Sequence, residues 1–454
     1  MTSTDTDPRA LSIDEQLSWL MEGTYFADEG GLAEATTTGA GLRSQMAAEL
    51  KAKLEHSAAL KAKGDPSWPL RVYLGVDPTT TSLHIGHMVP VVRMRKFQAL
   101  GHTAVFLIGD YTAMVGDPSG QSGEREQLTH ERVLELARFY TAQAFRLLDA
   151  DKTEVRYNGE WLAGLGFKEL AELAARFSVN RIVAREDFRK RMEAGKSVSL
   201  HETFYALMQG YDAFALNCDV QVGGYDQYLN LLAGRDLQAY FQQKLAGGAH
   251  PLYAQHPATG SAVKGPHVML TYPLLMGTDG RKMSKSWGNT IDVLDEPGDV
   301  YGKVMRVSDE MIAHYIDVAV EARAAEKDEW KRRAAVEPMA AKKWIAHRIT
   351  ALYCGEEEAE RAAEHFRRTV QDKQFSDEDI EERSVPEAYR AGGRRLTDLI
   401  VELELAASKS EAGRLIEQGG VKLNGAVVKD KFAMYTHAPG TLLQVGKRKV
   451  VRLT

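Results

Sequence analysis

Two histidines stand three residues apart in the motif His84-Ile85-Gly86-His87, where a short apolar run gives way to a helical pattern. The N-terminus of a helix carries unpaired N–H groups and a partial positive charge, so it attracts phosphate groups. Gly86 would let a nucleotide approach the backbone closely, and the imidazoles could donate hydrogen bonds to an α-phosphate as its charge grows in a transition state. The alternative is a structural histidine pair or half of a zinc site, although no other His/Cys cluster in the sequence supplies the missing ligands.

A second candidate for chemistry is the glycine-bounded segment GTDGRKMSKSWGN, residues 277–289, which carries Lys282, Ser284, Lys285 and Ser286. Glycines on both sides would let the segment move, and two lysines on a mobile loop could clamp a triphosphate and neutralise a leaving pyrophosphate. A solvated basic loop is the alternative. Because the sequence contains neither G-x-x-x-x-G-K-[ST] nor G-x-G-x-x-G, a Walker-type NTPase and a dinucleotide-dependent dehydrogenase are disfavoured.

The segments around the two histidines have the pattern of a strand–helix–strand unit. Apolar runs at 71–76 and 103–108 flank a helical stretch at 85–100. Parallel strands need a covering crossover of this kind, and Pro90 is acceptable in the helix only near its first turn. Two further strand-like runs follow, separated by helix-rich sequence, at 220–222 and 267–270. Together these runs predict an α/β fold with a doubly wound, Rossmann-like parallel sheet, whose ligands bind at the carboxyl ends of the strands.

The composition is that of a globular protein with several domains. The chain has 454 residues, of which 44% are apolar and 26% charged, enough to bury a sizeable core and to exclude wholesale disorder. Its net charge of −6 argues against a protein that coats DNA, so any nucleic-acid site must be local. Cys218 and Cys354 are the only cysteines, which excludes a disulfide framework and a four-cysteine zinc site. Since no apolar run is long enough for a membrane span and the N-terminus does not resemble a signal peptide, we expect a cytoplasmic protein without a membrane or DNA partner.

Basic residues are concentrated at the C-terminal end of the chain. Residues 394–454 contain 11 Lys and Arg against 6 Asp and Glu, a net charge of +5 that leaves −11 for the rest. A basic appendage on an acidic body is typical of contact with a polyanion, and a solvated basic face is the alternative. The helical segment KSEAGRLI and a turn at Asn424-Gly425 between two short strands predict a small α+β module in this region.

The motifs HIGH at 84–87 and KMSKS at 282–286, in that order on a parallel α/β pattern, resemble the two signatures of class I aminoacyl-tRNA synthetases. Over residues 70–300 the resemblance narrows to the bacterial-type tyrosyl-tRNA synthetases. It is carried by the stretches RVYLGVDPTT, VGDPSG, YALMQGYD and QVGGYDQ. The C-terminal module is similar to the family's RNA-binding domain of ribosomal-protein type, whereas the family pattern explains the segment before Arg71 least.

The resemblance and the element pattern together divide the chain into five parts. They are an N-terminal helical segment at 1–68, a Rossmann-like catalytic domain with both signatures at 69–291, an α-helical domain at 292–375, a linker at 376–393 and a basic RNA-binding domain of ribosomal-protein type at 394–454. The resemblance also implies a homodimer, which nothing in the composition indicates.

The activity that the resemblance implies is the ATP-dependent attachment of L-tyrosine to tRNA(Tyr), through tyrosyl-adenylate with release of pyrophosphate. His84, His87, Lys282 and Lys285 would be catalytic, stabilising the reacting phosphates without a covalent enzyme intermediate. ATP is then a substrate, and because the sequence shows no dedicated metal cage, Mg²⁺ would arrive with the nucleotide. A tryptophanyl-tRNA synthetase, a non-catalytic synthetase-like RNA-binding protein and a small-molecule nucleotidyltransferase are the alternatives.

The resemblance also assigns three sets of binding residues. For tyrosine they are Tyr73, Asp117, Asn158, Tyr205, Gln209, Asp212, Gln221 and Gln227. For ATP they are Gly75, Asp77, Thr79, Gly86, Gly224, Asp226, Ser284 and Arg125. For tRNA they are Lys409, Arg414, Lys422, Lys429 and Lys431.

Within the tyrosine set, the resemblance places Tyr73 and Asp212 at the phenol hydroxyl. The ammonium group of tyrosine would be held by Asp117, Tyr205, Gln209 and Gln227. Tyr205, Gln209 and Asp212 fall at i, i+4 and i+7, on one face of a helix. A buried carboxylate needs a partner, which the tyrosine hydroxyl supplies and phenylalanine does not. Without the resemblance, Asp212 would be interpreted as a surface or helix-terminal carboxylate, and Asp77 and Gly224 as turn residues.

Overall fold

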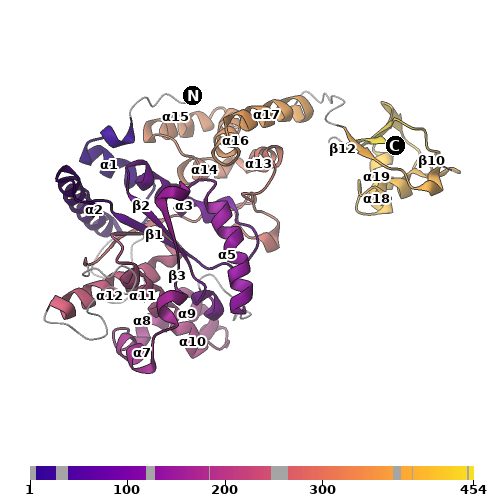
Figure 1. The fold of residues 1–454 in the computed structure, drawn as a ribbon. Helices are drawn as coiled ribbons and strands as arrows, with labels where there is room; N and C mark the ends of the chain where they lie inside the picture. The colour runs from indigo at the N-terminus through magenta and orange to yellow at the C-terminus, as the bar shows by residue number, and fades with distance from the viewer. Residues whose placement is uncertain are drawn as a thin grey trace. The chain divides into compact units, whose positions relative to one another are not determined.

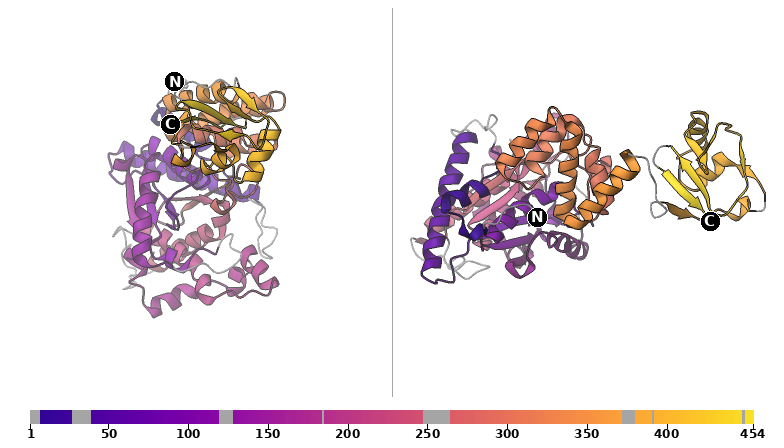
Figure 2. Two further views of the ribbon diagram at one scale, coloured as in Figure 1. Left: turned by 90° about the vertical axis from the view of Figure 1, so that its right-hand side faces the viewer. Right: turned by 90° about the horizontal axis from the view of Figure 1, so that it is seen from above.

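The computed structural model describes residues 7–26, 39–118, 128–183, 185–246, 264–371, 380–390, 392–446 and 449–454. The chain forms two compact units, Met1–Ala359 and Glu360–Thr454 (Figures 1 and 2). No helix within the described ranges is both long and apolar enough to cross a membrane.

The first unit is built around a five-stranded parallel sheet with the strand order β3–β2–β1–β4–β5. Its strands are β1 (Arg71–Val76), β2 (Thr103–Ile108), β3 (Thr153–Tyr157), β4 (Val220–Gly224) and β5 (Val268–Tyr272). Every pair of neighbouring strands is parallel, so all carboxyl ends lie at one edge of the sheet. The direction of the strand order reverses between β1 and β4, which is where doubly wound sheets bind their ligands. The predicted doubly wound sheet is confirmed, with β3 as a strand that the sequence did not reveal.

Helices cover both faces of the sheet (Figures 1 and 2). Helix α3 (Ile85–Ala99) packs on β1, β2 and β4, whereas α12 (Tyr228–Ala246) packs on β4 and β5. Met88, Met94 and Phe97 of α3 are completely buried, so this helix is fixed firmly to the sheet. Its N-terminus, at His84, therefore has a fixed position beside the end of β1.

Pro90 lies inside α3, close to its first turn. A proline at this position cannot donate to the carbonyl of Gly86, four residues before it. Since Gly86 belongs to the first turn, the lost hydrogen bond affects only the end of the helix, and the buried Pro90 side chain adds to the core.

The N-terminal segment is anchored to α3 by buried charges. It contains the 3₁₀ turn Pro8–Ala10, α1 (Ile13–Leu20) and α2 (Gly39–Ala62). Directly after α1, the Glu22 carboxylate accepts a hydrogen bond of 3.0 Å from Lys96 Nζ of α3 and lies 3.6 Å from Lys327 Nζ of α15 (Ala324–Ala334). Because a buried charge is stable only when paired, Glu22 fastens this segment and α15 to the helix that begins with the histidine motif.

The remaining helices of the first unit follow the strands in chain order. Between β2 and β5 they are α4 (Thr112–Val115), α5 (His130–Ala144), α6 (Gly159–Leu162), α7 (Phe167–Ala174), α8 (Val179–Val183), α9 (Glu186–Glu193), α10 (Leu200–Thr203) and α11 (Tyr205–Leu216). After β5 come α13 (Pro297–Met305), α14 (Ile312–Val318), α15 (Ala324–Ala334), α16 (Pro338–Cys354) and α17 (Glu356–Phe366), the last of which continues into the second unit. The helical character predicted after residue 293 agrees with these bounds.

The second unit has its own apolar core under a five-stranded sheet of order β6–β12–β11–β8–β9. Its elements are β6 (Glu381–Arg383), β7 (Arg394–Arg395), α18 (Leu396–Glu402), α19 (Lys409–Glu417), β8 (Val421–Leu423), β9 (Ala426–Val428), β10 (Met434–Tyr435), β11 (Thr441–Val445) and β12 (Lys449–Leu453). The predicted turn is present between β8 and β9, where Asn424 and Gly425 both have positive φ.

Part of the predicted linker at 376–393 belongs to this folded unit. Strand β6 pairs in parallel with β12, and Val385 and Tyr389 are buried in the core. The polar sequence Glu381–Arg383 gave no strand signal because β6 is an edge strand, which uses its backbone for pairing and leaves its side chains largely exposed. The linker prediction is therefore wrong for residues 381–389.

Candidate active site

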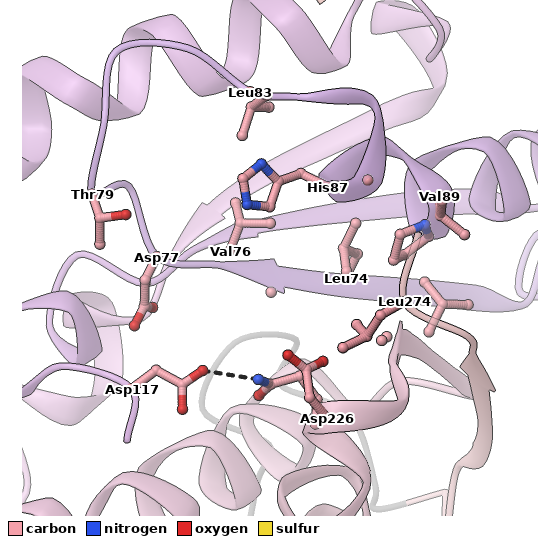
Figure 3. A pocket seen from close by; sticks show the side chains of 18 of the residues that line it. Leu74, Val76, Asp77, Thr79, Leu83, His87, Val89, Asp117, Asp226 and Leu274 are labelled. Atoms are coloured by element: carbon pink, nitrogen blue, oxygen red, sulfur yellow. Dashed lines mark hydrogen bonds between the residues drawn. The ribbon is translucent and has the colours of Figure 1, made fainter. Parts of the chain in front are cut away.

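A cavity of about 770 Å³ opens at the carboxyl ends of β1 and β4, and both signatures line it. The histidine motif contributes His84, Gly86 and His87, while the lysine segment contributes Lys282, Ser284 and Lys285. Figure 3 shows His87 and Thr79 on one side of the cavity, with Asp117 and Asp226 on the other. Two segments that lie far apart in the sequence therefore converge on one space, as the sequence analysis predicted.

Most other predicted residues line the same cavity. Those are Gly75, Asp77, Thr79, Asp117, Asn158, Tyr205, Gln209, Asp212, Gln221, Gly224, Asp226 and Gln227. Tyr73 lies behind this wall, completely buried, and Arg125 lies outside the described residues. After the ligands that the resemblance assigns to these residues, we call the part around Asn158, Asp212 and Gln221 the tyrosine end, and the part around His84, His87, Lys282 and Lys285 the phosphate end.

At the phosphate end the two imidazoles stack on each other at the start of α3. Their ring centroids are 3.6 Å apart with an interplanar angle of 19°, and His87 Nδ1 accepts a hydrogen bond of 3.3 Å from the His84 backbone N–H. Desolvation and then the neighbouring Lys285 and Lys282 lower the pKa of His84 to about 4. Desolvation by the cavity walls and then His84 lower the pKa of His87 to about 3, although this side chain remains open to the cavity. Both rings are therefore neutral at pH 7, and each carries one N–H donor.

The lysines reach the cavity from the opposite side. Lys282 Nζ lies 3.7 Å from Asp226 Oδ2, and Lys285 Nζ donates a hydrogen bond to Ser82 Oγ in the turn before the histidine motif. Burial raises the pKa of the Asp226 carboxyl, and the Lys282 ammonium opposes that shift. The side chain of Lys282 is half exposed, so a phosphate could replace Asp226 as its partner without loss of buried contacts.

At the tyrosine end, both oxygens of the buried Asp212 carboxylate accept hydrogen bonds. Asp212 Oδ1 accepts from Trp161 Nε1 at 2.8 Å, and Asp212 Oδ2 accepts from Asn158 Nδ2 at 3.1 Å. Burial raises the pKa of Asp212 to about 7, and the hydrogen bonds from Trp161 and Asn158 act against that shift. Such an arrangement holds a carboxylate that can still accept a hydrogen bond from a hydroxyl group in the cavity.

Tyr73, which the resemblance places at the phenol hydroxyl of tyrosine, is hydrogen-bonded to Gln221. Its hydroxyl accepts a hydrogen bond of 2.7 Å from Gln221 Nε2, and burial raises its pKa well above the usual value for tyrosine. Tyr73 is therefore neutral, and its hydroxyl is held in place by Gln221, whose side chain does line the cavity.

A third group of contacts joins the two ends. Asp117 Oδ2 accepts from Gln227 Nε2 at 2.8 Å, the dashed line in Figure 3. Tyr205 Oη donates to Asp77 Oδ2 at 2.9 Å, and Thr112 Oγ1 donates to Asp77 Oδ1 at 2.7 Å. Asp77, assigned to ATP from the resemblance, therefore also holds Tyr205 at the start of α11.

Three supporting residues escaped the sequence analysis: Trp161, Thr112 and Gly109. Thr112 accepts from Asn158 Nδ2 at 3.0 Å and so connects Asp77 to Asp212. A Cβ at Gly109 would lie 2.0 Å from Asp77 Oδ1 and 2.3 Å from Thr112 Oγ1, so only glycine fits there. The signal that could have revealed Trp161 is its place three residues after Asn158, within a short helix that follows a strand.

The five basic residues assigned to tRNA lie in the second unit. Lys409 and Arg414 are on α19, Lys422 is on β8, and Lys429 and Lys431 follow β9. Lys409 pairs with Asp398 at 2.9 Å and Lys431 with Glu417 at 2.8 Å, both at the surface. Exposed ion pairs of this kind contribute little stability and can be exchanged for phosphate contacts.

Metal ligands are not gathered anywhere in the part of the chain that the structure describes: no group of three or more His, Cys, Asp or Glu side chains is placed to hold an ion. The cavity itself offers carboxylates singly, each with a hydrogen-bond or ion-pair partner.

The fold and the converging signatures define a class I aminoacyl-tRNA synthetase.

Comparisons with known proteins give the family. The family model for class I tRNA synthetases (W and Y) matches residues 66–371, and the S4 domain model matches residues 394–431. The tyrosine–tRNA ligase of Thermotoga maritima is 40% identical over 400 residues, covering 87% of this chain and 92% of that protein. The tyrosine–tRNA ligase of Oleidesulfovibrio alaskensis is 39% identical over 450 residues, covering 98% and 99%. The chain belongs to the class I tRNA synthetases for tryptophan and tyrosine, and within them to the bacterial tyrosine–tRNA ligase family.

Solved structures support the fold at lower identity. A C-terminally truncated mitochondrial tyrosyl-tRNA synthetase of Aspergillus nidulans aligns with a TM-score of 0.57 at 21% identity, covering 78% of this chain and 93% of that one. A tyrosyl-tRNA synthetase of Archaeoglobus fulgidus, solved with L-tyrosine, aligns with a TM-score of 0.51 at 21% identity, covering 78% and 100%.

Proposed function

We propose that this protein activates L-tyrosine with ATP and transfers it to tRNA(Tyr). The observation that carries the proposal is the single cavity that combines the two signatures at one end with the buried Asp212 carboxylate at the other. The family membership favours tyrosine over tryptophan.

In the first step the carboxylate of tyrosine attacks the α-phosphorus of Mg·ATP. The bond to the bridging oxygen breaks, and pyrophosphate leaves with the electron pair. His84 and His87 donate hydrogen bonds from neutral rings to the α-phosphate as its charge grows, and Lys282 and Lys285 neutralise the leaving pyrophosphate. The magnesium ion belongs to the substrate.

Recognition of the nucleotide and of tyrosine occupies different walls. ATP contacts Gly75, Asp77, Thr79, Gly86 and Ser284, and its ribose hydroxyls bind Gly224 and Asp226. The phenol hydroxyl of tyrosine donates to Asp212, while Asp117, Tyr205, Gln209 and Gln227 hold its ammonium group. The carboxylate of tyrosine then points toward the phosphate end.

The test of this assignment is pyrophosphate exchange into ATP with each amino acid in turn. We expect exchange with tyrosine only. Exchange driven by tryptophan, or none with any amino acid in a folded sample, would contradict it. In the second step the terminal adenosine of tRNA attacks the adenylate carbonyl and AMP leaves, so tRNA charging completes the test.

We further infer that the S4 domain binds the phosphate backbone of tRNA through Lys409, Arg414, Lys422, Lys429 and Lys431. Replacing Lys422 and Lys429 by alanine should weaken tRNA binding and leave pyrophosphate exchange unchanged. Each lost phosphate contact should also reduce the slope of log K against log salt by roughly 0.7 to 0.9. A double variant with the affinity and salt slope of the parent protein would refute this role.

The family resemblance also leads us to propose a cytoplasmic homodimer. Phe167 on α7, Val179 on α8 and Leu200 on α10 are exposed apolar side chains that a subunit interface would cover. Light scattering after gel filtration should give twice the chain mass of 50.3 kDa. Replacing all three residues by serine should shift the protein toward the monomer.

A further inference from the structure

The segment that carries the signature lysines is held in place by one buried amide, that of Asn289. Its Oδ1 accepts a hydrogen bond of 2.8 Å from the backbone N–H of Ser284, and its Nδ2 donates to the carbonyl of Lys282 at 3.2 Å. Nδ2 also donates to Asp279 Oδ1 at 2.8 Å. The residue is 2% exposed, and its side chain does not line the cavity.

Backbone hydrogen bonds close the base of the loop beside the Asn289 side chain. The backbone N–H of Thr278 donates to the Asn289 carbonyl at 3.1 Å, and that of Gly277 donates to the Arg281 carbonyl at 2.7 Å. A Cβ at Gly277 would stand 2.3 Å from Asn289 Nδ2 and 2.4 Å from its Cγ, so the close approach requires glycine.

The Asn289 amide therefore bridges the backbone on both sides of Met283, which is itself buried at 3% exposure. Lys282 and Lys285 flank the turn at Met283 and Ser284. The geometry of this turn therefore sets the direction in which both lysine side chains leave the backbone. A lysine side chain is long and flexible, and it can stabilise a leaving group only if its backbone is already in the correct place.

We propose that Asn289 is a positioning residue for the activation step: through its hydrogen bonds to residues 279, 282 and 284, it fixes the turn from which Lys282 and Lys285 reach the leaving pyrophosphate. This inference deepens the proposed function and rests on it. Asn289 acts on the reaction through the lysines and has no contact with tyrosine. Its loss should consequently slow adenylate formation without weakening tyrosine binding.

Two different variants test the same contact. Asn289→Asp keeps the size and the acceptor for Ser284, but it removes both donors and places a second carboxylate beside Asp279. Gly277→Ala leaves Asn289 intact and displaces it sterically. We expect each variant to slow single-turnover adenylate formation by up to about 100-fold, the loss typical of a misplacement of about 1 Å, with the dissociation constant of tyrosine unchanged.

A third variant separates positioning from general damage. In the double variant Asp279→Asn, Asn289→Asp the donor and the acceptor change places, so the link between the two side chains can form again. We expect it to regain at least tenfold in rate over Asn289→Asp alone. Arg281→Gln is the matched control, because it removes another partner of Asp279 and leaves all three hydrogen bonds of Asn289 in place; its rate should stay within twofold.

Adenylate formation at the parent rate in Asn289→Asp would overturn the inference. It would equally be overturned if tyrosine affinity and thermal stability fell together with the rate and the double variant failed to recover. Failure of the parent protein itself to form tyrosyl-adenylate would instead count against the proposed function, so the two can be distinguished.

Discussion

The two ends of the active-site cavity are built in opposite ways. At the tyrosine end, Asp212 is 2% exposed and Asn158 is completely buried, and both sit in a closed hydrogen-bond network. At the phosphate end, the Lys282 side chain is 50% exposed and has a single long ion pair to Asp226. A substrate is bound tightly by groups that are already held in position before it arrives. A phosphate chain that reacts needs groups that can move as its charge changes during the reaction.

The difference also separates the energetic roles of the two ends. A buried carboxylate with fixed donors discriminates between substrates that have and lack a hydroxyl, because the wrong substrate leaves a desolvated acceptor without a partner. Neutral imidazoles and mobile ammonium groups discriminate between the ground state and the transition state, since their interaction grows with the charge on phosphate. Substitutions at the phosphate end should therefore change rates, and those at the tyrosine end should change affinities.

The largest effect is expected for His84→Ala. The variant loses a donor to the α-phosphate in the transition state, which should slow adenylate formation about 10²- to 10³-fold. Tyrosine affinity, measured by equilibrium binding without ATP, should stay unchanged. His84→Gln retains an N–H donor and should recover part of the rate. If tyrosine affinity fell as much as the rate, the assignment of catalysis to the phosphate end and of tyrosine binding to the other end would be wrong.

Asp212→Asn should produce the converse result. Hydrogen bonds to charged groups contribute about 1.5–3 kcal/mol, so tyrosine should bind roughly 10- to 100-fold more weakly. Phenylalanine, which makes no such bond, should be affected much less, and the preference for tyrosine should fall by a similar factor. The ratio of the two amino acids in pyrophosphate exchange measures this directly, and a ratio equal to that of the parent would exclude Asp212 from recognition of the phenol.

The phosphate end could be predicted from sequence far better than the support of the tyrosine end. HIGH and KMSKS are contiguous motifs, and parallel strands bring their carboxyl ends to one edge, so their convergence follows from the fold class. Trp161 and Thr112 carry no motif, because what matters is their distance from Asp212 and Asp77 in space. Trp161 is placed by β3, whose sequence TEVRY is only half buried, and Thr112 is placed by the turn that follows β2.

Two further features were not predicted because they also depend on contacts between residues that lie far apart in the sequence. Glu381–Arg383 forms a strand because its backbone pairs with β12. A pairing partner so far along the chain cannot be recognised from the local sequence. Gly109 is required only because Asp77 and Thr112 approach its α-carbon, a contact between separate loops. Sequence patterns identify residues that act through their own chemistry, and they pass over residues that act through a neighbour.

A smaller effect should appear in the pH dependence of tyrosine binding. Since burial raises the pKa of Asp212 to about 7, this group is mostly protonated at pH 6 and mostly ionised at pH 8. The ionised form accepts the phenol hydroxyl, so affinity should rise with pH, by about tenfold between pH 6 and pH 8. His84, with a pKa of about 4, stays neutral over this range, so the rate at saturating substrates should not follow the same curve. Asp212→Asn should bind tyrosine equally well at both pH values.

The smallest effect, and the sharpest comparison, is expected for Trp161→Phe. The substitution keeps an aromatic ring in the core and removes only the indole N–H that donates to Asp212 Oδ1. That hydrogen bond lowers the pKa of Asp212 against the effect of burial, so its loss should move the midpoint of the pH profile of tyrosine binding above 7. A hydrogen bond of about 1 kcal/mol corresponds to a pKa shift of about 0.7, so at pH 7 the ionised fraction of Asp212 should fall from about one half to about one sixth. Tyrosine should then bind about threefold more weakly at pH 7, and at sufficiently high pH the affinity should return toward that of the parent. A variant that merely disturbed the packing would be weaker at every pH, whereas a shifted midpoint shows that Trp161 acts on the ionisation of Asp212. The same variant should leave single-turnover adenylate formation from bound tyrosine unchanged, because it touches nothing at the phosphate end.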